Sequence, residues 1–431
     1  MESRLATALD ATLNGTGLPF QVMTHLRCSD PECGTALELH DRSLACPRCG
    51  DLLEIAVELR DPNPTALKKL WRERRCSDQA PDTSGVWRFR ELLPDYPAQE
   101  IVTMSEGNTP LVTGFRTAQW AGMRNLWFKH LGWNPTGSFK DLGMTAGMTE
   151  AKFIGAKTVA CASTGNTAAS LAAYAARAGL AARVYLPAGQ ASANKLAQAL
   201  DFGAQVIEIE GSFDDALETL LKSADPDLYF LNSINPFRVE GQKTAIFEML
   251  EQFGWNVPDY LFVPGGNLGN SSAFGKALSE LHAFGFLEKL PRMVIVQAEG
   301  ANPLARLWSS GSRQLQALPH PETAATAIRI GNPRSWKKAL RAIELTGGMV
   351  IDVTDEEIGE AKRMIGHDGI GCEPASATTL AGLRKLRAAG KIDPDARVAA
   401  ILTGHALKDT DYIINSQKKI EDAHMAGAHA R

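Results

Sequence analysis

From about residue 100 onward, short runs of β-branched residues alternate with longer Ala-rich runs along the chain. Short apolar runs bounded by turn residues are typical of buried strands, whereas longer Ala-rich runs favour helices. The pattern predicts strands at Thr158–Ala162, Arg183–Leu186, Gln205–Glu210, Tyr229–Leu231, Tyr260–Val263, Met293–Gln297, Met349–Val353 and Val398–Leu402. Helices are predicted at Thr167–Ala178 and Phe213–Lys222, and Thr354 with Glu357 has capping-box spacing. This alternation predicts an α/β fold with at least two parallel sheets.

Length and charge narrow the class of protein. The chain has 431 residues, of which 44% are hydrophobic and 22% charged, so we expect a globular protein of more than one domain. A net charge of −4 provides no basic surface field, so neither nucleic acid nor an anionic membrane is an expected partner. The N-terminus has no secretory-signal pattern, and the odd count of seven cysteines does not suggest a disulfide framework. A cytoplasmic location is therefore expected.

Glycine-rich and polar loops follow two of the predicted strands, at the sheet edge where α/β proteins bind ligands. Ser163–Thr167 (STGNT) precedes a helix whose free N–H groups would suit a carboxylate. Gly265–Asn270 (GGNLGN) also joins a strand to a helix, and its glycines let several N–H groups approach one phosphate. This loop lacks the spacing of a dinucleotide fingerprint and the Lys-Ser/Thr pair of a P-loop.

Three further segments carry chemically useful side chains. Lys140 ends the segment PTGSFK beside an apolar run, and a buried lysine amine can lose its proton and form a Schiff base. Arg238 lies just after Asn232 and Ser233, and a guanidinium with two short polar donors suits a phosphate or carboxylate. Thr403 is a strand-end hydroxyl that could face a heteroaromatic nitrogen. Each segment alone is also compatible with a structural turn or a solvated side chain, but together they suit Schiff-base chemistry on a phosphorylated amino acid.

Several segments also carry a family resemblance, in the order GVWRFRELLP, SEGNTPL, PTGSFKDLGMT, ASTGNTAAS, NSINPFRVEGQKT, VPGGNLGN and LTGHALKD. Over nearly its whole length the chain resembles the fold-type-II pyridoxal-phosphate (PLP) enzymes and, within them, the threonine synthases. The resemblance implies a tryptophan synthase β-like architecture with two parallel-sheet domains. Residues 86–145 and 240–431 would form the large PLP-binding domain, residues 146–239 a small mobile domain, and residues 1–85 an N-terminal segment.

The resemblance also implies a role for each loop. Lys140 would carry the cofactor as a Schiff base and then act as general base and acid. Asn166 would bind the phenolic oxygen of the cofactor, and Thr403 would face its pyridine nitrogen. The cofactor phosphate would be held by Gly265, Gly266, Asn267, Leu268, Gly269 and Asn270. The substrate carboxylate would be held by Ser163, Thr164 and Thr167, and the substrate phosphate by Asn232, Ser233 and Arg238.

The reaction implied is the conversion of O-phospho-L-homoserine and water into L-threonine and phosphate by a homodimeric enzyme. Cysteate synthase, or another PLP-dependent replacement or elimination, is the nearest alternative. A hydroxy-amino-acid dehydratase has no substrate phosphate and would not need the clamp at Arg238. An inactive PLP fold carrying a zinc-ribbon interaction module is a third possibility, against which the acidic pI and the intact Lys140 both argue.

The first cysteines form two pairs, Cys28 with Cys33 and Cys46 with Cys49, and each pair is followed by a glycine. Four thiolates at such spacings can close a tetrahedral zinc site. The segment 28–49 resembles the cysteine-rich knuckle found at the N-terminus of some threonine synthases. Its first pair departs from the usual C-x2-C spacing, so a metal-free relic of the knuckle remains an alternative. Cys76, Cys161 and Cys372 are expected to be small buried residues.

Overall fold

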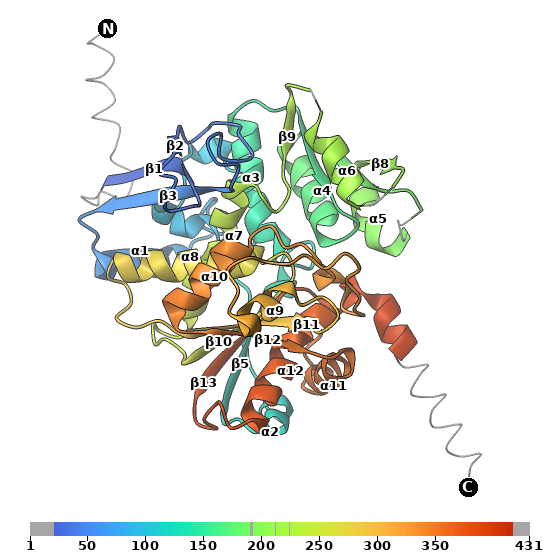
Figure 1. Ribbon diagram of the computed structural model, residues 1–431. Coiled ribbons are helices and arrows are strands. Elements are labelled where there is room, and N and C mark those ends of the chain that lie inside the picture. Colours follow the sequence, from blue (N-terminus) through green and yellow to red (C-terminus); the bar gives the residue numbers. More distant parts are fainter. Residues whose placement is uncertain (1–20, 190–192, 212, 224, 417–431) are drawn as a thin grey trace.

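The computed structural model describes residues 21–189, 193–211, 213–223 and 225–416 (Figure 1). It begins with a small antiparallel sheet of order β2-β1-β3, built from β1 (Gln21–Cys28), β2 (Ala36–Leu37) and β3 (Leu53–Arg60). Helix α1 (Pro64–Arg75) follows, where Asn63 accepts a hydrogen bond from the Ala66 N–H. These three strands were not among the predicted elements.

A large sheet forms the centre of the molecule, with the order β12-β11-β10-β13-β5-β4. Its strands are β4 (Leu111–Thr113), β5 (Asn125–His130), β10 (Tyr260–Pro264), β11 (Arg292–Ala298), β12 (Met349–Val353) and β13 (Arg397–Leu402). All neighbouring strands are parallel except the edge strand β4. Side chains alternate between two cores: Leu261 and Val263 point into one, and Phe262 into the other. A sheet that is apolar on both faces must be covered by helices on both.

The helices that cover the large sheet divide between its two faces. One core contains residues of α7 (Pro236–Gln252), α8 (Gly269–Ala283), α9 (Pro303–Ser310) and α10 (Trp336–Thr346). The other contains residues of α2 (Arg116–Ala121), α11 (Asp355–His367) and α12 (Pro374–Ala388). The predicted capping box of Thr354 and Glu357 is confirmed at the start of α11.

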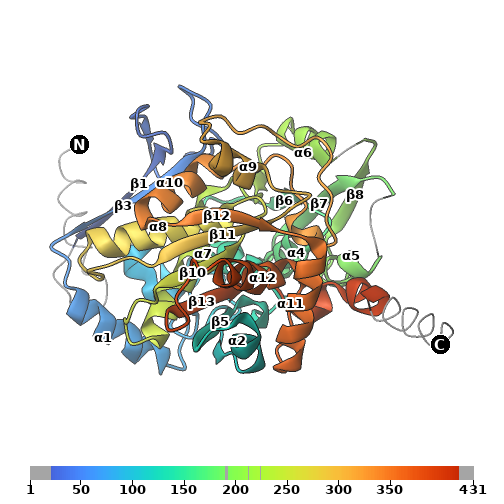
Figure 2. The same ribbon diagram turned by 60° about the horizontal axis from the view of Figure 1, so that its bottom comes forward.

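A second parallel sheet lies to one side of the large one, in green in Figures 1 and 2. Its order is β8-β7-β6-β9, from β6 (Thr158–Ala162), β7 (Ala181–Pro187), β8 (Gln205–Ile209) and β9 (Leu228–Phe230). Its helices are α3 (Lys140–Phe153), α4 (Asn166–Ala178), α5 (Ala193–Asp201) and α6 (Phe213–Leu221). The prediction of two parallel sheets is therefore confirmed, and every predicted strand lies within two residues of an observed one.

The division into domains stays a prediction, although the two sheets fall in the expected segments. Both predicted boundaries of the small domain lie inside helices, residue 146 in α3 and residue 239 in α7. These two helices pack against each other, and their first turns carry Lys140 and Arg238. Within the described part of the chain, no helix is long and apolar enough to cross a membrane.

Candidate active site

Lys140 is the first residue of α3 and is held beside the end of the large sheet. The N–H of the preceding Phe139 donates to the Thr403 carbonyl at 2.9 Å, and the Lys140 Nζ lies 4.2 Å from the centre of the Phe139 ring. Burial, together with the positive charge of Arg238, lowers the pKa of Lys140 to about 7. A large fraction of the amine is therefore neutral near pH 7, which a nucleophilic lysine requires.

Arg238 is a buried cation with few partners. Its side chain is 1% exposed, and its Nη1 donates to the Leu231 carbonyl at 2.9 Å. Its Nε has no hydrogen-bond partner, and no described carboxylate forms a salt bridge with it. Burial lowers the pKa of Arg238 to about 10. An unpaired buried guanidinium is costly, so its position near Lys140 indicates a site for an anion.

The loop predicted to hold the cofactor phosphate touches the predicted substrate clamp. The Asn267 Nδ2 donates to the Ser233 Oγ at 2.5 Å, while its Oδ1 accepts from the Arg334 N–H at 2.7 Å. Asn232, in contrast, uses its amide on the backbone of Ala162, at 3.1 and 3.2 Å. The structure therefore places Ser233 against the glycine-rich loop, whereas the side chain of Asn232 is hydrogen-bonded to the backbone at the end of β6.

The glycine-rich loop runs from the end of β10 to the start of α8, and Gly269 begins that helix. Leu268 adopts a left-handed conformation with φ of 63°, which turns the loop into the helix. A Cβ at Gly265 would lie 2.7 Å from Ile295, so a larger residue would collide with the sheet. Two buried oxygens beside this loop, Asn270 Oδ1 and Ser271 Oγ, have no partner. The Ser271 hydroxyl can donate a hydrogen bond, and together with the N–H groups of a helix N-terminus it suits a phosphate group.

The loop STGNT joins β6 to α4 and is partly exposed. The Ser163 N–H donates to the Tyr185 carbonyl at 3.1 Å, and the Ser163 Oγ accepts from the Gly165 N–H at 3.2 Å. A Cβ at Gly165 would meet no atom within 4 Å, so the loop borders open space there. Thr164 and Thr167 are half-buried in the same loop, which leaves them accessible to a small molecule.

A hydrogen-bond network connects Asn166 with Thr403 through Glu373. The Asn166 Nδ2 donates to Glu373 Oε2 at 3.0 Å, and the Thr403 Oγ1 donates to Glu373 Oε1 at 2.8 Å. The Ser376 Oγ lies 3.0 Å from the Thr403 Oγ1 and accepts from the Thr403 N–H at 2.8 Å. Burial raises the pKa of Glu373, whereas the hydrogen bonds from Thr403 and Asn166 oppose that change. The two residues predicted to face the cofactor ring thus share one carboxylate.

Three residues of this region were not predicted from the sequence. Glu373 directly precedes Pro374 at the start of α12. Polar residues are common at helix starts because they cap the helix, so nothing in the sequence assigns Glu373 to the site. Ser376 is in the first turn of the same helix. Asp141 is fully buried and accepts hydrogen bonds from the Thr136 N–H at 2.7 Å and the Ser170 Oγ at 2.5 Å. Its place directly after Lys140 was the only signal that could have found it.

The predicted zinc knuckle brings four sulfur atoms together. All four lie within 4.8 Å of one another, and they belong to Cys28, Cys33, Cys46 and Cys49. Sulfurs bound to one zinc ion at about 2.3 Å would be separated by roughly 3.8 Å, so the cluster fits that geometry. Gly34 and Gly50 have φ of 66° and 77°, as tight knuckle turns require. Asp51 anchors this segment to α10 through Lys337 Nζ at 2.5 Å.

The remaining cysteines divide into buried and exposed ones. Cys161 and Cys372 are buried, as predicted. The prediction was wrong for Cys76, which is exposed because it follows the last turn of α1 as its C-cap.

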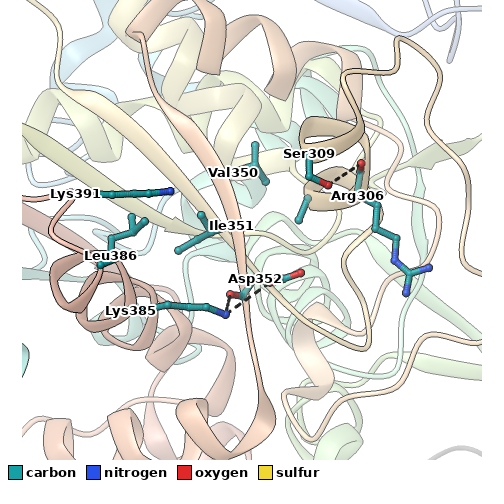
Figure 3. A pocket seen from close by; sticks show the side chains of 10 residues that line it. Arg306, Ser309, Val350, Ile351, Asp352, Lys385, Leu386 and Lys391 are labelled. Carbon is teal, nitrogen blue, oxygen red and sulfur yellow. Dashed lines mark hydrogen bonds and ion pairs between the residues drawn. The ribbon is translucent and has the colours of Figure 1, made fainter.

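A surface pocket of about 340 Å³ opens between β12, α9 and α12, away from these residues (Figure 3). Arg306, Lys385 and Lys391 line it, and the Lys385 Nζ donates to the Asp352 carbonyl at 2.8 Å. None of the lining residues belongs to a predicted site, and the nearby Asp352 carboxylate offsets part of the positive charge. We therefore assign the pocket no part in the chemistry at Lys140.

Comparison with known proteins agrees with this arrangement. The family described as pyridoxal-phosphate dependent enzyme matches residues 102–404. Threonine synthase of Methanocaldococcus jannaschii is 45% identical over 390 residues, which cover 90% of this chain and 94% of that protein. Threonine synthase of Synechocystis is 45% identical over 364 residues, covering 82% and 91%. Maize serine racemase, with a TM-score of 0.59 and 21% identity, covers 69% of this chain and 89% of that structure, and it shows the fold alone. The chain therefore belongs to the pyridoxal-phosphate dependent enzymes and, within them, to the threonine synthase family.

Proposed function

We propose that the protein converts O-phospho-L-homoserine and water into L-threonine and phosphate at Lys140. The observation that carries this proposal is the pairing of a lysine amine whose pKa is lowered to about 7 with a buried guanidinium that has no ion-pair partner, that of Arg238. A substrate for this pair needs a carbonyl-reactive amino group and a strongly anionic group on one small molecule. A phosphorylated amino acid has both, and two relatives named threonine synthase support threonine as the product.

Pyridoxal phosphate fits the residues around Lys140. The cofactor phosphate would be held at the start of α8, where the Ser271 hydroxyl lacks a partner and can donate to it. Asn166 and Thr403 would hold the two polar positions of the ring, and Lys140 would bind its aldehyde carbon. When bound, the cofactor supplies an electron sink for negative charge next to the substrate amino group.

The chain's own residues supply the proton transfers and the anion sites. The Lys140 Nζ, with its pKa near 7, can accept a proton from the substrate and return it at another carbon. A phosphate bound at Arg238 would offset the positive charge that lowers the pKa of Lys140. The amine would therefore become a stronger base when substrate is present, which links proton removal to the presence of the correct substrate.

Each end of the substrate has an expected site. The guanidinium of Arg238 and the hydroxyl of Ser233 would hold the phosphate while it leaves the γ-carbon. The N-terminus of α4, with Ser163, Thr164 and Thr167, would hold the carboxylate. Since α4 lies on the small sheet and the glycine-rich loop that would hold the cofactor on the large one, a substrate bound to α4 and to the cofactor would hold the two sheets together.

The proposed function is tested by incubating the protein with PLP and O-phospho-L-homoserine and measuring threonine and phosphate together. We expect equal release of both products, abolished in Lys140→Ala and retained in Lys391→Ala, a lysine in the surface pocket. Phosphate released without threonine would mean elimination alone, and the water-addition step would be wrong. Activity only with O-phosphoserine and sulfite would move the protein to cysteate synthase.

We further propose that Cys28, Cys33, Cys46 and Cys49 bind a structural zinc ion, which the clustering of their sulfur atoms supports. A closed four-thiolate site leaves no open position for substrate, so the metal would have a structural and not a catalytic role. All seven cysteines are without disulfides, which agrees with the reducing conditions of the cytoplasm.

We also propose a homodimer, as the family resemblance implies, and light scattering on the purified protein would test it.

A further inference from the structure

Lys408 joins the loop that precedes Lys140 to a helix of the small sheet. It ends η5 (Ala406–Lys408), the short helix that follows β13, and its side chain is partly buried. The Lys408 Nζ donates to the Thr136 carbonyl at 3.1 Å and also to the Gln198 Oε1. Gln198 belongs to α5, and the chain after β13 passes beside this helix (Figure 2). One ammonium group therefore bridges the Lys140 loop and α5.

The same loop has a second connection to the small sheet, and water is excluded from it. Asp141 accepts hydrogen bonds from the Thr136 N–H at 2.7 Å, the Thr136 Oγ1 at 2.6 Å and the Ser170 Oγ at 2.5 Å. Ser170 lies on α4, and the three residues are at most 1% exposed. Breaking such bonds leaves buried polar groups without partners, which is costly. We therefore expect α4 to stay fixed beside the Lys140 loop.

The bond between Lys408 and Gln198 is of a different kind, because both side chains are partly exposed. Water can take the place of either partner, so this bond opens at lower cost than a buried one. Its donor is charged, which makes it stronger than a bond between neutral groups and favours the position of α5 seen here. A fixed contact at α4 and a breakable one at α5 would let α5 move toward and away from the Lys140 loop.

Two other hydrogen bonds across the site involve residues that the ligands would need. Asn166 donates to Glu373 at 3.0 Å, and Asn267 donates to the Ser233 Oγ at 2.5 Å. In the proposed function Asn166 binds the cofactor and Ser233 the substrate phosphate, so both bonds would change when the ligands bind. The bond to α5 has no such competition, because neither of its residues has a predicted ligand contact.

We propose that Lys408 is a positioning residue that holds α5 closed over the bound substrate by bridging the Lys140 loop and Gln198. The inference rests on the proposed function, which places the substrate between Lys140 and the start of α4. With the bridge broken, substrate would enter and leave. Apparent affinity falls in proportion to the fraction of molecules that are in the binding state. The bridge therefore acts on the apparent affinity for substrate and not on the rate once substrate is bound.

Steady-state kinetics test this division. Gln198→Ala removes the acceptor on α5 and leaves Lys408 bonded to Thr136. Its KM for O-phospho-L-homoserine is expected to rise about 10-fold, as for the loss of one hydrogen bond to a charged group, while kcat stays unchanged. Gln198→Glu keeps an acceptor for Lys408 and should keep the wild-type KM. The double variant Gln198→Ala/Lys408→Met should have no higher KM than Lys408→Met, since both changes break the same bond.

Hydrogen exchange of the PLP-bound protein gives a readout that needs no turnover. The backbone amides of α5 should exchange faster in Gln198→Ala and in Lys408→Met than in the wild-type protein, because the bridge no longer holds this helix. Lys222→Met is the matched control. Lys222 is an exposed lysine just after α6 that pairs with Glu218, and its replacement should change neither KM nor the exchange of α5.

Each other outcome decides against the bridge. A lower kcat with unchanged KM in Gln198→Ala would mean that the bond shapes the Lys140 loop, and a higher KM without faster exchange would mean that Gln198 binds substrate directly. Faster exchange without a change in KM would show that α5 does not cover the substrate. If Lys408→Met did not fold, Gln198→Ala and Gln198→Glu would decide the question. The proposed function fails separately, because faster exchange of α5 in a protein that makes no threonine would leave the bridge standing.

Discussion

Replacing Arg238 by methionine should remove the anion site with little loss of stability. Burial lowers the pKa of Arg238 from 12.5 to about 10, and at about 1.4 kcal/mol per pKa unit this corresponds to roughly 3 kcal/mol against the charged side chain. The substitution also removes the donor to the Leu231 carbonyl, which costs about 1–3 kcal/mol. The folded protein should therefore be between unchanged and about 2 kcal/mol more stable.

The catalytic efficiency of Arg238→Met should fall, although its stability should not. Loss of a buried charge-assisted contact to the substrate costs about 2–5 kcal/mol, so kcat/KM should fall roughly 30-fold to several thousand-fold. With PLP bound, so that the glycine-rich loop is occupied, inorganic phosphate should raise the unfolding temperature of the wild-type protein and leave that of Arg238→Met unchanged. Arg363→Met, an exposed arginine on α11, is the matched control and should keep the phosphate effect. If Arg238→Met lowered stability by several kcal/mol and kept its response to phosphate, Arg238 would be a structural residue.

Three further predictions follow from the same structure. Burial lowers the pKa of Lys140 to about 7, so the rate at which the apoprotein binds PLP should rise through pH 7 and level off near pH 8; a rate still climbing toward pH 10 would indicate an ordinary lysine. Burial raises the pKa of Asp141 from 3.8 to about 6, so the stabilising effect of its protonated form is lost as pH rises through 6. In urea unfolding, the free energy of unfolding of wild-type protein should fall by about 1.4 kcal/mol relative to that of Asp141→Asn between pH 5 and 8. A difference between the two proteins that stays constant with pH would refute this. In Cys46→Ser, zinc measured by atomic absorption should fall from about one per chain toward zero, while an unchanged content would place the metal elsewhere.

The parallel strands were predictable because each is a continuous apolar run. Strands β6 and β12 have the predicted bounds, Thr158–Ala162 and Met349–Val353, and both are bounded by clear turn or capping residues. The antiparallel strands β1 and β3 were missed. Their burial does not follow a clean alternation, since Ile55, Ala56 and Val57 are buried in succession. The sequence also does not show that the two strands pair from Gln21 with Arg60 to Cys28 with Leu53.

The loops of the site were predictable, but the contacts between them were not. Glycine-rich and polar segments at strand ends are visible in the sequence, and this located Lys140 and Gly265–Asn270. The bond between Asn267 and Ser233 joins residues 34 positions apart, and that between Asn166 and Glu373 joins residues 207 apart. Such pairs depend on how the two sheets face each other, which no local pattern encodes.

Helix α10 links the N-terminal segment to the glycine-rich loop. Lys337 of α10 pairs with Asp51 beside the cysteine cluster, and the Arg334 N–H, just before α10, holds Asn267. The cysteine cluster therefore supports the helix whose start fixes the glycine-rich loop. This connection would give the proposed zinc ion a structural role in the site.

The central claim is that Lys140 directs elimination of phosphate and addition of water to one substrate. Turnover of O-phospho-L-homoserine in H2 18O tests it most directly, with mass spectrometry of both products. The account predicts 18O in the hydroxyl group of threonine and none in phosphate, because the carbon–oxygen bond breaks and water adds to carbon. Label in phosphate, with homoserine as the other product, would show simple phosphate-ester hydrolysis and contradict the account.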